Sequence, residues 1–173
     1  MTMKAMTIIG DLEEEYVKEV LETLLAFKIS DEIDKEAPIQ MVLSTYGGSI
    51  NEMFSVYDLM REIREECEIH THGVGKVMSA GVLLLAAGTK GKRKIGKNCR
   101  VMIHSVLAGC EGPYHVLENE MEEIRFLQEQ YKNCLIEETN LTMTTLDKFF
   151  KSNKNTYLNA YQALKLGIVD EIV

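Results

Sequence analysis

The 173 residues, 46% apolar and 27% charged, have the composition of an ordinary globular protein, so we expect one domain over residues 1–173. A formal net charge of −8 leaves no basic surplus for neutralising phosphates, which argues against nucleic acid as the main partner. No stretch reaches the roughly 18 apolar residues of a membrane span, and the first residues lack the apolar core of a secretory signal. We therefore expect a cytoplasmic protein.

The first half of the chain predicts strands that alternate with helices. A helix over about 12–29 is indicated by apolar residues at the i, i+3, i+4 spacing of one face. A short helix at 78–87 is apolar on every side, so it must be buried. The other elements expected here are strands at 5–9, 39–44 and about 68–74, and a helix at about 51–66.

The second half predicts short strands at 93–95 and 100–104, a long helix at about 115–138, helices near 145–151 and 160–166, and a strand at 168–172. Alternating strands and helices indicate an α/β fold with a largely parallel sheet. The long helix is acidic and comes after all but one of the expected strands. Its apolar stripe could pack on a partner subunit or back on its own domain; the stripe comprises Leu117, Met121, Ile124, Leu127, Tyr131 and Leu135.

Three segments combine glycine with reactive groups. In residues 44–50, two adjacent glycines either bring backbone N–H groups close to a ligand or only make the turn. Ser79 begins the buried helix, beside free N–H groups and the positive end of the helix dipole, where an oxyanion is stabilised. The alternative for Ser79 is an ordinary helix N-cap.

His104 ends an apolar strand, where it is either a structural residue or a general base within ~3 Å of a hydroxyl. Taken together, the three segments supply a nucleophile, a base and oxyanion donors, which are the parts needed for acyl transfer.

Longer runs resemble the proteolytic subunit of the Clp protease family. The run Gly81-Val-Leu-Leu-Leu-Ala-Ala-Gly-Thr-Lys-Gly-Lys-Arg93 and the run Asn98-Cys-Arg-Val-Met-Ile-His104 are closely similar to that family. Residues 46–49 match its proline-glycine-glycine turn, and Ala163-Leu-Lys-Leu-Gly-Ile-Val-Asp170 matches its C-terminal signature. The resemblance covers nearly everything from residue 6 to 173.

This resemblance implies a serine endopeptidase that cleaves unfolded proteins and peptides, with Ser79 as nucleophile and His104 as base. It places the oxyanion-hole amides on Gly48 and Ala80. It also implies a spiral of ββα units, of the type shared with crotonases, and a protruding handle helix at about 115–138. The expected assembly is a homo-oligomer of stacked heptameric rings. An AAA+ unfoldase would use ATP, and this chain would need neither a cofactor nor a metal.

The sequence also departs from the family pattern. Asn155 stands where the family has the aspartate of the triad, and an asparagine cannot carry the charge that stabilises imidazolium. We therefore expect Asn155 as third catalytic residue and reduced activity. The N-terminal hairpin that lines the axial pore is expected to be missing. Gln40 and Val42 replace tyrosines of the unfoldase docking pocket, and Tyr46 replaces the turn proline.

These departures favour an alternative, a weakly active or non-catalytic assembly subunit of a mixed ring. A crotonase-type enzyme acting on acyl-CoA is a second alternative, against which the Ser79/His104 pair argues.

Two further clusters have weaker functional interpretations. His70 and His72 share one face of a strand near Cys67, but a metal site needs further ligands at fixed geometry, so we expect none. Lys76 could form a Ser–Lys dyad with Ser79, although His104 makes such a dyad unnecessary.

Overall fold

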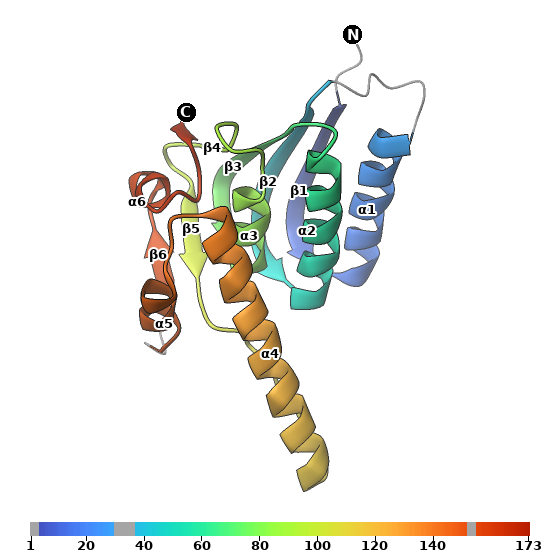
Figure 1. The fold of residues 1–173 in the computed structure, drawn as a ribbon, viewed down its shortest axis with the longest axis vertical. Helices are drawn as coiled ribbons and strands as arrows, with labels where there is room; N and C mark the ends of the chain where they lie inside the picture. The colour runs from blue at the N-terminus through green and yellow to red at the C-terminus, as the bar shows by residue number, and fades with distance from the viewer. Residues whose placement is uncertain (1–3, 30–36, 152–154) are drawn as a thin grey trace.

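The computed structural model describes residues 4–29, 37–151 and 155–173, which form a mixed α/β fold (Figure 1). This confirms the fold class expected from the sequence. The elements in chain order are β1 (Lys4–Leu12), α1 (Glu14–Ile29), β2 (Ile39–Gly48), α2 (Ile50–Arg64), β3 (Ile69–Met78), α3 (Ala80–Ala86), β4 (Lys94–Ile95), β5 (Arg100–Ile103), α4 (Tyr114–Glu138), α5 (Met143–Lys151), β6 (Thr156–Leu158), α6 (Ala160–Lys165) and β7 (Glu171–Ile172).

The sheet is almost entirely parallel. Its main path runs β1-β2-β3-β4-β7, and β5 continues the pairing of β3 beyond the point where β4 ends. Only β6, which pairs with β5, is antiparallel among the described strands. Sequence reasoning missed β6, since three residues are too few to show an alternating pattern. It also ended β2 and β3 too early, because both strands run on into glycine-containing segments.

Helices α1 and α2 lie side by side against the sheet, and α3 is enclosed at the centre (Figure 1). Every residue of α3 is buried, which confirms the prediction from its uniformly apolar sequence. The strands contribute alternate residues to the same core, as the burial pattern of β2 shows, because successive strand side chains point to opposite faces. The core therefore holds both strand β3 and helix α3, which meet at Ser79.

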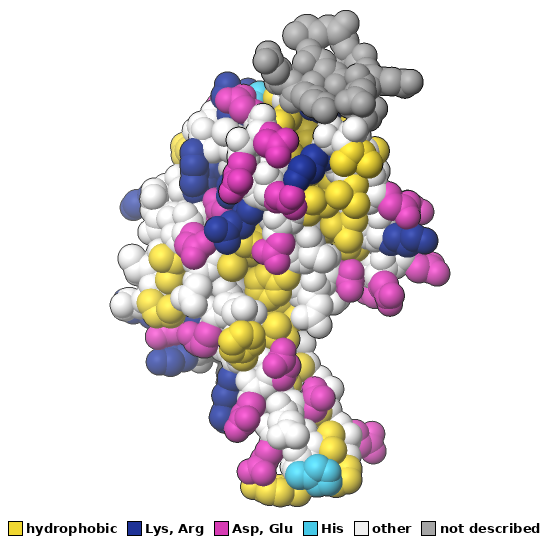
Figure 2. All heavy atoms as spheres, turned by 45° about the vertical axis from the view of Figure 1, so that its right-hand side comes forward, with side chains coloured by type: hydrophobic (Ala, Val, Ile, Leu, Met, Phe, Trp, Pro, Cys, Tyr) yellow, Lys and Arg dark blue, Asp and Glu magenta, His cyan; other side chains and the backbone are white. Residues whose placement is uncertain are grey.

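The handle helix α4 projects away from the body over most of its length (Figure 1). Its buried residues all lie in its last two turns: Tyr131, Lys132, Leu135 and Glu138. The projecting part carries acidic side chains with hydrophobic ones between them (Figure 2), and Met121 is 44% exposed there. The predicted stripe is thus split. Its first four residues lie on the projecting part, whereas Tyr131 and Leu135 pack into the chain's own body, which is the second of the two expected placements.

Glu138 fixes the C-terminal end of α4 to the body. Its carboxylate accepts hydrogen bonds from Arg64 at 2.7 and 3.0 Å and from the Tyr57 hydroxyl at 3.1 Å. Lys90 lies 3.4 Å from the same carboxylate. A buried carboxylate with this many charged and polar partners is held in one geometry, so the root of the handle helix is rigidly placed.

Among the described residues, no helix combines the length and the apolar character that crossing a lipid bilayer requires.

Candidate active site

Ser79 occupies a strained turn between β3 and α3. Its φ of 53° makes it the one non-glycine residue with positive φ in the described parts of the chain. Such a conformation costs about 1–3 kcal/mol and persists only where the surroundings impose it. Ser79 is the residue before the first turn of α3, yet its side chain makes no capping hydrogen bond. The N-cap interpretation is therefore wrong, and the hydroxyl is free for another partner.

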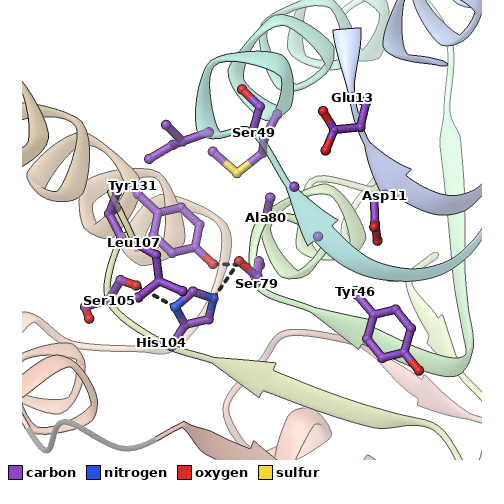
Figure 3. A pocket seen from close by; sticks show the side chains of 15 residues that line it. Asp11, Glu13, Tyr46, Ser49, Ser79, Ala80, His104, Ser105, Leu107 and Tyr131 are labelled. Carbon is purple, nitrogen blue, oxygen red and sulfur yellow. Dashed lines mark hydrogen bonds between the residues drawn. The ribbon is translucent and has the colours of Figure 1, made fainter. Parts of the chain in front are cut away.

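That partner is His104. Strands β3 and β5 pair in parallel with Met78 opposite Met102, and the Ser79 N–H donates to the Met102 carbonyl at 2.8 Å. The chain leaving β5 therefore passes beside the Ser79 turn. The distance from Ser79 Oγ to His104 Nε2 is 2.8 Å (Figure 3). The structure thus brings together two residues, 25 positions apart, at the distance that proton transfer requires.

The other ring nitrogen of His104 determines the tautomer. Its Nδ1 lies 2.5 Å from the carbonyl oxygen of Ser105 (Figure 3). A carbonyl can only accept, so Nδ1 carries the hydrogen and Nε2 is left to accept from the Ser79 hydroxyl. This is the tautomer that can take a proton from serine. Sequence reasoning missed Ser105 in this role, and no side-chain pattern could have indicated it, because the acceptor is a backbone atom.

Asn155 lies close in register but does not contact the ring. In the antiparallel pair of β5 and β6, Ile103 lies opposite Thr156. The next residues in this register, His104 and Asn155, therefore also lie opposite each other. The Asn155 side chain is nevertheless exposed, and within the described residues no hydrogen bond joins it to the imidazole. Its role as third catalytic residue stays a prediction.

The two predicted oxyanion donors line the same cavity as Ser79 and His104. The Ser49 N–H donates to the Leu12 carbonyl on β1, so the preceding amide, that of Gly48, points to the opposite edge of the strand, the side of Ser79. Ala80 begins α3, and the first amides of a helix have no partner within it. Both residues therefore line the cavity, and their role as oxyanion donors stays a prediction.

The cavity has a volume of about 520 Å³, within the range of sites that enclose ligands. Asp11 and Glu13 contribute to its wall beyond the Gly48 strand (Figure 3). Its apolar lining comes from Ile50, Met53, Val106, Leu107 and the ring of Tyr131. The Ser79–His104 pair therefore opens into a partly apolar cavity large enough to hold part of an extended chain.

Gly47 makes the closest approach to the nucleophile turn, which the sequence did not reveal, since both glycines of the pair looked alike. A Cβ on Gly47 would lie 2.6 Å from Ser79 Cβ and 2.9 Å from the Met78 carbonyl oxygen. Its φ of 106° also disfavours any side chain. The Gly47 N–H donates to Thr45 Oγ1 at 2.9 Å, and this hydrogen bond holds the Gly47 backbone in place.

The remaining candidate residues are engaged elsewhere. Ser49 caps α2 by accepting from the Glu52 N–H at 3.4 Å. Lys76 does not reach toward a dyad; its Nζ lies 4.3 Å from the centroid of the Tyr46 ring. His70 lies between Gln40 and Glu68, with ring-nitrogen contacts of 2.9 and 2.7 Å.

His72 is a separate case from its neighbour His70. Its Nε2 is buried without a hydrogen-bond partner among the described residues. Burial, and then the charge of Lys94, lowers the pKa of His72. No group of three or more His, Cys, Asp or Glu side chains in the described residues could hold a metal ion.

Replacing Gly47 by alanine should destabilise the protein more than the same change at Gly10. Both glycines have similar φ values, 106° and 99°, but a Cβ on Gly10 meets nothing within 4 Å. Gly10→Ala should therefore cost only the strain of about 1–3 kcal/mol, whereas Gly47→Ala adds about 1–3 kcal/mol of overpacking. Thermal and denaturant unfolding measure both. Equal losses for the two variants would contradict the close packing of Gly47 on Ser79.

Comparison with known proteins identifies the family of the chain. The family model described as Clp protease matches residues 1–173. An ATP-dependent Clp protease proteolytic subunit 1 from Prochlorococcus marinus subsp. pastoris is 32% identical over 140 residues, which cover 81% of this chain and 69% of the relative. The subunit 1 of Prochlorococcus marinus strain MIT 9312 is 32% identical over 149 residues (86% and 73%). The subunit 2 of a Synechococcus strain is 30% identical over 140 residues (81% and 69%). The chain therefore belongs to the Clp protease family.

Proposed function

We propose that this chain is a serine endopeptidase whose nucleophile is Ser79 and whose general base is His104. The observation that carries the proposal is the 2.8 Å contact between Ser79 Oγ and His104 Nε2, made from a strained serine that caps no helix. Positive φ at a residue that also contacts a base is typical of a nucleophile held ready for attack.

The reaction follows from the geometry. Ser79 Oγ attacks the scissile carbonyl while its proton moves to His104 Nε2, and the bond to the leaving amine then breaks as Nε2 returns that proton to it. The amides of Gly48 and Ala80 stabilise the oxyanion of the tetrahedral intermediate. A water molecule then attacks the acyl carbonyl while the same nitrogen takes its proton, and the bond to Ser79 Oγ breaks as Nε2 returns that proton to Oγ. No step requires a cofactor or a metal.

The expected context is that of a Clp-type protease. We infer a single peptidase domain that assembles into a cytoplasmic homo-oligomer of stacked heptameric rings and degrades unfolded proteins and peptides in protein quality control. The names of the relatives include ATP dependence, which we assign to a separate AAA+ unfoldase. Gln40, at a position expected to help dock that unfoldase, is hydrogen-bonded to His70, so docking here would involve polar contacts.

A weakly active or non-catalytic assembly subunit is the second candidate. It is favoured by the absence of a contact between Asn155 and His104 in the described residues, which leaves the ring with a neutral acceptor. A fluorophosphonate probe that reacts with activated serines separates the two candidates, because a silent subunit should not become labelled.

Ser79→Ala should abolish both labelling by the fluorophosphonate and cleavage of short fluorogenic peptides, because it removes the hydroxyl that lies 2.8 Å from His104 Nε2. Ser49→Ala and Ser105→Ala serve as matched controls. Both residues line the same cavity, but the Ser49 hydroxyl caps α2 and Ser105 contributes only its carbonyl to His104. Labelling that persists in Ser79→Ala would remove Ser79 from the nucleophile role.

Asn155→Asp should raise peptidase turnover, because a carboxylate across from His104 could accept from Nδ1–H and stabilise the imidazolium as it forms. In a serine protease with a serine–histidine–aspartate triad, replacing the aspartate with asparagine lowers turnover about 10⁴-fold. We expect a smaller gain, about tenfold to a hundredfold, since the Ser105 carbonyl already holds the tautomer. Turnover is compared between pH 6 and 9 at unchanged particle size. Equal or slower turnover would show that Asn155 is not the third triad residue.

Ile124→Glu should split the assembly, because it places a charge in the apolar stripe of the projecting part of α4. Sedimentation of the wild type should show a particle far larger than 19.6 kDa, and that of the variant a smaller one. Glu123→Gln, at the neighbouring exposed position, is the control and should leave the particle intact. A wild type that stays monomeric at micromolar concentration would contradict the proposed assembly.

A further inference from the structure

Tyr131 links the handle helix to the nucleophile turn. It lies where α4 enters the body, it is 4% exposed, and its hydroxyl donates to the carbonyl oxygen of Ser79 at 3.0 Å (Figure 3). Its ring is stacked on Phe150 of α5, with the centroids 6.2 Å apart and the planes 3° from parallel. The hydroxyl is therefore delivered to Ser79 by a side chain that two helices hold in place.

The accepting carbonyl belongs to the peptide unit that also contains the Ala80 amide. A trans peptide unit is planar, so its C=O and N–H point in opposite directions, and no cis bond occurs in the described residues. The Ser79 oxygen accepts from the Val82 N–H at 3.0 Å as well as from Tyr131. Two donors on the oxygen fix the rotation of this plane, and with it the direction in which the Ala80 N–H points.

The hydrogen bond from Tyr131 to the Ser79 carbonyl also makes the Ala80 amide a stronger hydrogen-bond donor. Hydrogen bonding to a carbonyl polarises its peptide unit and makes the attached N–H a better donor, since bonds in a chain reinforce one another. Burial raises the pKa of Tyr131, so its hydroxyl keeps its proton and stays a donor. The space in front of the Ala80 amide is kept open by Gly47, where a Cβ would lie 3.1 Å from the Ala80 nitrogen.

We propose that Tyr131 is a positioning residue that orients and polarises the Ala80 amide as an oxyanion donor, through its hydrogen bond to the Ser79 carbonyl. This role rests on the proposed function of Ser79. Tyr131 thus connects the last turns of the handle helix to the nucleophile turn through one hydrogen bond.

The test compares Tyr131→Phe with Tyr57→Phe. The first variant keeps the ring that stacks on Phe150 and loses only the hydroxyl. The second removes an equally buried tyrosine hydroxyl, one that donates at 3.1 Å to Glu138 rather than to Ser79. Glu138 keeps its two hydrogen bonds from Arg64 in this variant, so the root of α4 stays in place. Active serines are counted by fluorophosphonate titration, so that kcat is expressed per intact site. A peptide boronate, which forms a tetrahedral adduct with serine, reports on oxyanion stabilisation separately from substrate binding.

Tyr131→Phe should lower kcat per titrated serine about fivefold, the effect of one net hydrogen bond. The affinity for the boronate should fall by the same factor. KM should stay unchanged, and so should the apparent pKa of the acidic limb of the curve of kcat against pH. Tyr57→Phe should lower the melting temperature but leave kcat within about twofold. Should Tyr131→Phe fold poorly, Tyr131→Met, which fills the site with a flexible apolar chain and has no donor, should show the same loss.

Wild-type values of kcat and boronate affinity in Tyr131→Phe or Tyr131→Met, with an active wild-type protein, would overturn the role of Tyr131 and leave the proposed peptidase intact. An equal loss of kcat in Tyr57→Phe would also overturn it, because the effect would then reflect general destabilisation. A wild-type chain that neither labels nor cleaves would overturn the peptidase proposal, and the role of Tyr131 would fall with it.

Discussion

The backbone turn at Ser79 is the constraint on which the rest of the site depends. A serine with positive φ is unfavourable on its own, so neighbouring elements must hold it. The Met102 carbonyl holds the amide from β5, Tyr131 holds the carbonyl from α4, and Gly47 on β2 leaves room for the turn. Because α3 begins directly after the turn and is wholly buried, the turn cannot relax without moving the core.

The handle helix combines two different physical environments. Its last turns are fixed by the buried carboxylate of Glu138, whereas its first turns carry half-exposed apolar residues and many acidic ones. Burial alone would raise the pKa of Glu138, but the hydrogen bonds and charge of Arg64, with the charge of Lys90, lower it overall. The carboxylate therefore stays ionised at neutral pH, and the root of the helix stays anchored beside Ser79. If subunits assemble through the projecting turns of α4, the same helix connects that interface to Ser79 through Tyr131.

Sequence patterns predicted what depends on side-chain type. Uniform apolarity located α3, strand and helix alternation gave the α/β sheet, and the family resemblance identified Ser79 and His104 as a pair, which the structure brings to 2.8 Å. The features that were missed depend on backbone atoms or on tertiary packing. The Ser105 carbonyl has no sequence signature, and Gly47 and Gly48 differ only in what surrounds them. Tyr131 fitted the amphipathic stripe of a long helix, and periodicity alone cannot show where such a helix enters its own body.

In the proposed reaction, the acceptor at His104 Nδ1 takes over one of the two roles of the aspartate in a serine–histidine–aspartate triad. An acceptor at Nδ1 has two separate effects, since it fixes the tautomer and it stabilises the positive charge on the ring. The Ser105 carbonyl provides the first as well as a carboxylate would. It provides the second only as a dipole, and hydrogen bonds to charged acceptors are roughly twice as strong as those to neutral ones. In the proposed reaction the geometry of proton transfer is therefore complete, and the missing charge acts only when the imidazolium forms. Any deficit should accordingly appear in kcat, while the contacts that bind a peptide in the cavity are unaffected.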